Sequence, residues 1–388
     1  MTLFDMQRRR LLQYGFTGLG AFVGNSLLPG SIQAASLSLV SLGELLLPDQ
    51  NGVRLPAGFT SRIVARSGQT ISGYRWHAAP DGGATFATGD GSWIYVSNSE
   101  LDNKAGGAGA LRFNQQGEIV EAYSILNNTT RNCAGGHPPW QTWLSCEETE
   151  RGRVWECDPF GRKTAQVRNA LGLFKHEAVA VDITHKQLYL TEDEKNGCLY
   201  RYTARSFDAA GNPNLDDGFL EVAEVIAGQI GAVRWHKLSD PLATSIPTRR
   251  QVAQSTAFKG GEGIWHHQGI IYFTTKGDNR VWAYDVQFQQ LSIIYNAALY
   301  LQPVLTGVDN ITTNAAGELL VAEDGGDMQI VVLSAGKVLP LLQIIGHKDS
   351  EITGPAFSPD GSRLYFSSQR GKTGKSEDGI TFEITGPF

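Results

Sequence analysis

The sequence has little methionine and shows no long apolar repeat of helical period. It contains three methionines in 388 residues, against 45 glycines, 17 phenylalanines and 12 tyrosines. An amphipathic helix shows apolar residues at a period of about 3.6. The absence of that pattern beyond the signal-like N-terminus argues against long helices. Barrels and propellers often exceed the usual domain size, so the composition favours one large all-β domain.

The sequence also lacks any concentration of positive charge. The net charge is −6, and the lysines and arginines are scattered along the chain. This excludes nucleic acid as a partner. There is no G-x-x-x-x-G-K loop and no G-x-S-x-G elbow, which argues against a P-loop enzyme and an α/β-hydrolase.

Paired cysteine motifs are absent as well. The four cysteines stand at positions 133, 146, 157 and 198, and none of them makes a C-x-x-C pair. The spacing excludes a zinc ribbon. In an oxidising compartment, disulfide formation is the default expectation for such cysteines.

The N-terminus resembles a twin-arginine export signal. Arg8 and Arg9 precede a short, glycine-containing apolar segment, and Ile32-Gln33-Ala34 gives a small-residue cleavage pattern. A membrane anchor is the alternative, but the apolar stretch is short and interrupted. We expect residues 1–35 to be a signal peptide and residues 36–388 to be one catalytic domain. The mature protein is then periplasmic or secreted, without a stable membrane anchor, and its export partner is the twin-arginine machinery. Because that route carries proteins that have already folded, it suggests that a metal is loaded in the cytoplasm before export.

A hairpin plan recurs along the chain. Each copy has a loop residue that is often acidic, a strand, a polar turn, and a second strand ending in polar or acidic residues. The copies span residues 75–100, 134–148, 176–193, 261–278, 308–325 and 354–371. Hairpins at intervals of roughly 40 to 50 residues are typical of β-propellers. We predict six blades, with insertions within residues 196–258; a β-sandwich pair is the alternative.

Hairpin geometry predicts where the acidic residues meet. The first residue of the outgoing strand and the last residue of the returning strand lie at the same end of a hairpin. If the hairpins are radial, these ends converge at the mouth of the central channel. The residues concerned are Glu100, Glu147, Glu148, Glu177, Glu192, Asp193, Glu262, Asp309, Asn310, Glu323 and Asp324. Such crowded carboxylates require protonation or bound cations. Oxygen ligands of this kind suit calcium.

Three further residues occupy the same phase of the repeat. Cys133 lies beside Gly135 and Gly136, and a thiolate in the cluster would favour iron or zinc beside calcium. Arg370 follows the second strand of the last hairpin and could grip a phosphoryl group. His176 precedes Glu177 and could donate a proton to a leaving alkoxide, or make a structural hydrogen bond. His266 and His267 lie in a turn at the other end of their hairpin and are expected to be solvated.

Several blocks resemble the PhoX family of secreted bacterial alkaline phosphatases. They are "RNCAGGHPPWQTWLSCEE" (residues 131–148), "KHEAVAVD", "LYLTEDEKNGCLYRY", "FKGGEGIW", "DNITTNAAGELLVAEDGG" and "FSPDGSRLYFSSQRG". The resemblance implies a six-bladed propeller whose mouth holds Fe3+ and Ca2+ and hydrolyses phosphate monoesters. It further implies that Cys133 is an iron ligand, that the acidic residues bind iron or calcium or support those ligands, and that Arg370 contacts phosphate. The chain looks like a short member, with Ser99 where the family pattern has histidine and Pro138 where it has threonine.

Two other functions remain open at this point. One is a calcium-dependent propeller lactonase or esterase, which needs one hard cation and no thiolate. The other is a non-catalytic propeller in which calcium is structural. For the phosphatase, we expect a small phosphorylated substrate and a monomeric protein.

Overall fold

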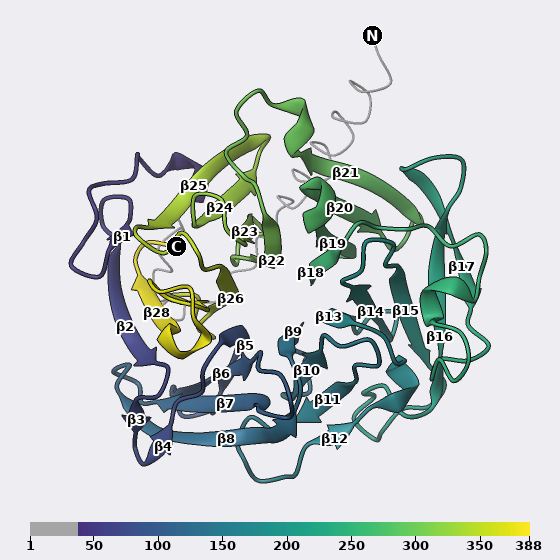
Figure 1. Cartoon of the computed structure of the whole chain (residues 1–388), viewed down its shortest axis with the longest axis horizontal. Coiled ribbons are helices and arrows are strands. Elements are labelled where there is room, and N and C mark those ends of the chain that lie inside the picture. Colours follow the sequence, from purple (N-terminus) through teal and green to yellow (C-terminus); the bar gives the residue numbers. More distant parts are fainter. Residues whose placement is uncertain (1–37) are drawn as a thin grey trace, which may run out of the picture.

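The structure, a computed structural model, describes residues 38–388 and shows β-sheets arranged in a ring around a centre (Figure 1). The helical elements of this part are 3-10 helices of three residues: η1 (Leu39–Ser41), η2 (Asn169–Leu171), η3 (Thr248–Arg250), η4 (Lys276–Asp278), η5 (Ala297–Leu299) and η6 (Ser376–Asp378). The all-β propeller arrangement is therefore confirmed. Within residues 38–388, no helix is long and apolar enough to span a bilayer. The predicted signal peptide lies outside the described residues.

Two four-stranded sheets come first in the chain after a small N-terminal segment. That segment holds the hairpin of β3 (Thr70–Ile71) and β4 (Tyr74–Arg75). The first sheet contains β5 (Pro80–Ala87), β6 (Trp93–Ser99), β7 (Gly106–Phe113) and β8 (Ile119–Thr129). The second contains β9 (Asn132–Gly136), β10 (Trp143–Glu147), β11 (Val154–Cys157) and β12 (Gln166–Val167).

The middle of the chain forms one continuous nine-stranded sheet. Its first part contains β13 (His176–Asp182), β14 (Gln187–Glu192), β15 (Leu199–Ala204), β16 (Gly218–Val225) and β17 (Gly231–Lys237). Its second part contains β18 (Gly261–His267), β19 (Ile270–Thr275), β20 (Arg280–Asp285) and β21 (Gln290–Asn296). A short pairing of β17 with β21, through Gly231 and Ala232, joins the two parts.

Strands from both ends of the described chain complete the last two sheets. One sheet contains β22 (Val308–Thr313), β23 (Leu319–Glu323), β24 (Gln329–Ser334), β25 (Lys337–Ile344) and the early strand β1 (Val53–Arg54). The other contains β26 (Ile352–Phe357), β27 (Arg363–Ser368), β28 (Ile380–Thr385) and the early strand β2 (Thr60–Arg66). The purple β2 accordingly lies beside the yellow β28 in Figure 1. This pairing closes the ring.

The prediction of six separate blades is corrected by the hydrogen bonding. Four sheets stand alone as blades, and the remaining strands of the ring belong to the single nine-stranded sheet. The cause is β17, an additional strand within residues 196–258, where the repeat spacing had predicted insertions. It pairs with β16 on one side and with β21 on the other, so no gap separates these two parts of the ring.

Apolar side chains fill the space between neighbouring sheets. Leu320, Ile330 and Leu342 of the sheet that contains β22 are fully buried against Phe366 and Phe382 of the next sheet. Every residue of β23 is buried. Because a propeller sheet is covered on both faces, its strands read as nearly continuous apolar runs rather than as strict alternations.

Glycines allow the inner strands to approach one another closely at the centre. A Cβ on Gly136 of β9 would lie 2.2 Å from the carbonyl oxygen of Val179 on β13. A Cβ on Gly263 of β18 would lie 2.7 Å from the Cα of Asn310 on β22. Only glycine fits where two backbones come this close.

We predict that Gly136→Ala destabilises the fold by about 1 to 3 kcal/mol, the usual cost of overpacking a tight core. The free energy of unfolding, from urea denaturation, is the measurement. Gly43→Ala is the matched control, because a Cβ at Gly43 meets nothing within 4 Å. Equal stability of the Gly136 variant and the wild type would contradict this account of the centre.

Candidate metal centre

Five side chains leave five inner strands at the same place. Asp81, Cys133, Glu177, Glu262 and Asp309 are each the second residue of β5, β9, β13, β18 and β22. At this point the antiparallel register skips, so two residues of the inner strand face one residue of the second strand. Such β-bulges redirect a side chain out of the regular pleat. The repeated bulge thus supplies the first set of residues of the site.

The second strands supply another set at the same end of the hairpins. The residue directly after β6, β10, β14, β19, β23 and β27 is, in chain order, Glu100, Glu148, Asp193, Lys276, Asp324 and Gln369. The two sets lie close together because a hairpin returns its chain to the end from which it started.

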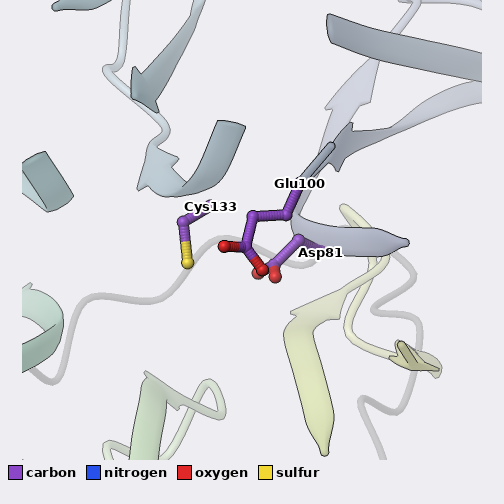
Figure 2. Close-up of side chains that lie close together, drawn as sticks. All are labelled: Asp81, Glu100 and Cys133. Carbon is purple, nitrogen blue, oxygen red and sulfur yellow. The ribbon is translucent and has the colours of Figure 1, made fainter. Parts of the chain in front are cut away.

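The first set, three residues of the second set and Glu351 form one continuous cluster. Potential ligand atoms lie within 4.8 Å of one another in four groups, and consecutive groups share a residue: Asp81, Glu100 and Cys133; Cys133, Glu148 and Glu177; Glu177, Glu262 and Asp309; and Asp309, Asp324 and Glu351. Figure 2 shows the first group, in which the thiol of Cys133 lies beside the carboxyl groups of Glu100 and Asp81. We call these nine residues the acidic cluster.

Burial makes the acidic cluster electrostatically unfavourable without cations. Glu177 is 1% exposed, and its Oε1 lies 3.2 Å from the Cys133 Sγ while its Oε2 has no hydrogen-bond partner. Burial and the neighbouring carboxylates of Glu262 and Asp309 raise the pKa of Glu177 well above its usual range. Burial is also the main cause that raises the pKa of Glu148 and of Asp309 to about 7. Burial likewise raises the pKa of the Cys133 thiol.

Four basic side chains surround the acidic cluster. Arg131 donates to Glu100 and Glu148 at 2.9 and 2.8 Å. The Nζ of Lys175 lies 3.1 Å from Glu148. Lys276 and Arg370 contact other members, and all four basic side chains retain between 22% and 37% of their exposure. Cations of the protein therefore cover the cluster on its solvent side, while the carboxylates lie deeper.

Three second strands, β10, β14 and β23, end in a glutamate that is followed by a second acidic residue, and the two members of each pair have different roles. Glu147 accepts from the backbone N–H groups of Thr130 and Arg153, at 3.1 and 3.2 Å. Successive residues of a strand point in opposite directions, so Glu148 points into the cluster while Glu147 holds loops. The same division places Glu192 and Glu323 outside the acidic cluster.

The hydrogen bonds of those two residues show structural roles. Glu192 is fully buried and accepts from the Tyr200 hydroxyl at 2.7 Å and from Arg249 at 2.8 Å. Glu323 accepts from the backbone N–H groups of Thr306 and Gln329, at 2.8 and 3.0 Å. These buried carboxylates hold the loops between strands.

The remaining predicted residues lie at or near the rim of the cluster. Asp193 lies 4.0 Å from Lys175 and belongs to none of the four groups. Asn310 donates to Asp309 at 2.8 Å and accepts from the Gly354 N–H at 2.6 Å. The amide of Asn310 thus orients Asp309 and links two sheets.

Arg370 and His176 have very different surroundings. Arg370 donates to Glu351 at 2.8 Å, lies 3.7 Å from Asp324, and is partly exposed beside the cluster. His176 is fully buried, with its ring centroid 3.6 Å from that of Phe174 and its Nε2 3.0 Å from the Gly172 carbonyl oxygen. Burial lowers the pKa of His176 to about 4. Its neighbours are those of a structural histidine.

The structure also shows the surroundings of the two adjacent histidines and the state of the cysteines. The prediction that His266 and His267 are solvated turn residues is wrong: both end strand β18 and are partly buried. His266 accepts from the Gly269 N–H at 3.2 Å. All four cysteines are free. The default expectation of disulfides is therefore not met.

Sequence reasoning missed two acidic members and three of the basic residues. Asp81 stands in Pro80-Asp81-Gly82, at the same phase as Glu262 in Gly261-Glu262-Gly263, so the repeat could have revealed it. Glu351 precedes its inner strand and lies outside that phase. No local signal marks the basic residues, which are Arg131, Lys175 and Lys276.

A cavity of about 150 Å3 runs between the inner strands next to the cluster. Its lining includes Gly82, Ala134, Ala178, Gly263 and Asn310, each of which directly follows a bulge residue of the cluster. The cavity lining is mostly apolar, whereas the bulge residues are acidic or a thiol. The acidic cluster therefore borders a mostly apolar cavity.

The donor set fits metal ions. Carboxylate oxygens are the ligands that hard cations such as calcium take, and a thiolate favours a softer or redox-capable ion. The unpaired, buried Oε2 of Glu177 lacks the partner that a bound cation would provide. The fold and the site together define a β-propeller protein with an acidic, thiol-containing cluster at one end of its central channel.

Comparison with known proteins gives the family. The sequence matches the family described as "Alkaline phosphatase PhoX" over residues 74–154 and 150–298. The chain belongs to this alkaline phosphatase PhoX family. No curated protein matches the sequence.

Solved structures share the fold at low sequence identity. Pseudomonas fluorescens PhoX in complex with vanadate, a transition state analogue, is similar with a TM-score of 0.73 and 18% identity, over 90% of this chain and 98% of that chain. The gluconolactonase XC5397 from Xanthomonas campestris is similar with a TM-score of 0.50 and 13% identity, over 89% of this chain and 98% of that chain. These likenesses support the propeller architecture.

The raised pKa values predict that the metal-free protein loses stability as the pH rises from about 5 to about 8. Between these values the unfolded state has already released the protons that folded Glu148 and Asp309 retain, so ionisation costs the folded state free energy. Thermal unfolding of chelator-treated protein is the measurement. Glu148→Gln should reduce the slope, whereas the exposed control Glu44→Gln should not. Constant or rising stability of the wild type over this range would contradict the prediction.

Proposed function

We propose that the protein is a metal-dependent alkaline phosphatase that hydrolyses phosphate monoesters, with iron and calcium bound by the acidic cluster. The observation that carries the proposal is the meeting of the Cys133 thiol with eight carboxyl groups, two of which, those of Glu177 and Glu262, have a buried oxygen without a hydrogen-bond partner. Membership of the family supports the reaction class. The family match alone does not identify ligands, and the residues of the acidic cluster are the ligands proposed here.

The composition of the groups suggests how the ions are distributed. The groups that contain Cys133, with Asp81, Glu100, Glu148 and Glu177, suit iron because they combine a thiolate with carboxylates. The groups without sulfur, which add Glu262, Asp309, Asp324 and Glu351, suit calcium. When bound, such ions neutralise phosphoryl oxygens and lower the pKa of a water molecule.

The residues of this chain then bind and orient the substrate. Arg370, Arg131 and Lys175 present partly exposed cationic groups above the buried carboxylates. A phosphate dianion arriving from solvent meets these groups first. Arg370 is the best placed to bind two phosphoryl oxygens, because a guanidinium is planar and can donate bidentately. Its link to Glu351 fixes its position at the rim.

The same proposal includes the scaffold and the location of the protein. We propose that the nine-stranded sheet counts as two blades, divided at the short β17–β21 pairing, which gives a six-bladed propeller. We also propose that the twin-arginine machinery exports the protein to the periplasm or beyond, and that it acts there as a monomer on small phosphorylated substrates.

We predict that Cys133→Ala loses its iron and at least about 100-fold of its turnover of p-nitrophenyl phosphate, because losing even an outer partner of a metal ligand costs 10- to 100-fold. Elemental analysis and initial rates are the measurements. Cys157→Ala is the matched control, since this thiol is buried among apolar residues outside the cluster. Full iron and activity in the Cys133 variant would contradict the assignment.

A calcium-dependent lactonase is the second candidate, favoured by the shared fold with the gluconolactonase XC5397. The two functions differ in their metal content and substrate. We expect purified protein to contain iron and to release phosphate from p-nitrophenyl phosphate without opening gluconolactone. Iron-free protein that hydrolyses the lactone would favour the second candidate, and metal-bound protein without either turnover would favour a binding protein.

A further inference from the structure

One residue beside the acidic cluster carries the opposite charge from its counterparts in the other hairpins. Directly after the second strands of four other hairpins stand Glu100, Glu148, Asp193 and Asp324. After β19 the corresponding residue is Lys276. This lysine is therefore a cation at a place where four of the other five hairpins have a carboxylate and the fifth has Gln369.

The contacts of Lys276 link two of the four groups. Its Nζ lies 3.2 Å from Glu262 Oε1 and 3.2 Å from Asp324 Oδ2. Glu262 and Asp324 belong to different groups, and Asp309 is the residue that these groups share. The ammonium therefore lies between the two groups that lack sulfur.

The electrostatics of Lys276 match those of a bound cation. Its ammonium lies between two carboxylates at 3.2 Å each, as a bound ion would. Lysine carries a compact point charge, unlike the planar guanidinium of arginine. It can therefore fill a gap between carboxylates much as a metal ion does.

We propose that the Lys276 ammonium takes the place of one metal ion between Glu262, Asp309 and Asp324, so that the acidic cluster holds one cation fewer than its carboxylates could bind. This inference rests on the proposed metal-dependent function and concerns the number of ions, not the reaction. The lysine supplies a permanent charge that neither chelation nor metal shortage removes.

The experiment counts bound cations after Lys276→Met, which keeps the length of the side chain and removes its charge. Chelator-treated protein is titrated with Ca2+ by calorimetry, and metal content is checked by elemental analysis after dialysis against Ca2+ and Fe3+. We expect one additional equivalent of Ca2+ relative to the wild type. Lys276→Arg, which keeps the charge, and the exposed Lys337→Met, on the outer strand β25, should both give the wild-type count.

An unchanged count in Lys276→Met would overturn the proposal. If that variant does not fold, anomalous diffraction from wild-type crystals soaked in Sr2+ decides the question. A peak coordinated by both Glu262 and Asp324, with Lys276 displaced, would refute the proposal, whereas Lys276 remaining between them without a peak would support it. Counts of bound metal do not require phosphate release, so failure here is distinguishable from failure of the proposed phosphatase activity.

Discussion

The central constraint on this molecule is electrostatic. Eight carboxyl groups and a thiol converge in a largely buried space at the centre of the ring. Like charges at such distances cannot all ionise unless cations compensate them. The chain supplies four of these cations itself, through Arg131, Lys175, Lys276 and Arg370, and the proposed metal ions supply the rest.

The local backbone explains why the cluster forms at all. A bulge at the second residue of five inner strands turns a side chain toward the centre. Side chains opposite the bulges then link consecutive hairpins of the ring: Asn98 donates to the Cys133 carbonyl oxygen at 2.9 Å, and Thr191 and Thr274 donate to the carbonyl oxygens of Glu262 and Asp309. These three hairpins thus fix the ligand-bearing backbone of the hairpin that follows, which preorganises the site.

Much of this architecture could be predicted from the sequence, because turns and hairpin ends are local features. The repeat indicated the propeller and brought Cys133, Glu177, Glu262 and Asp309 together correctly. The sequence could not show which member of each acidic pair points into the cluster. The choice between Glu147 and Glu148, for example, depends on the residue at which the strand ends. The count of separate blades failed because the pairing of β17 with β21 involves only two residues on each strand. Contacts made by long basic side chains, such as that of Lys276, produce no periodic pattern in the sequence, so they could not be predicted.

The pairing of β2 with β28 affects how the protein folds during its synthesis. A strand formed by residues 60–66 finishes the sheet that contains residues 380–385, and groups of the cluster draw on positions from Asp81 to Glu351. A growing polypeptide that has not yet reached Glu351 therefore cannot hold the complete acidic cluster, however many of its hairpins have already folded. The ring itself closes only when residues 380–385 pair with residues 60–66.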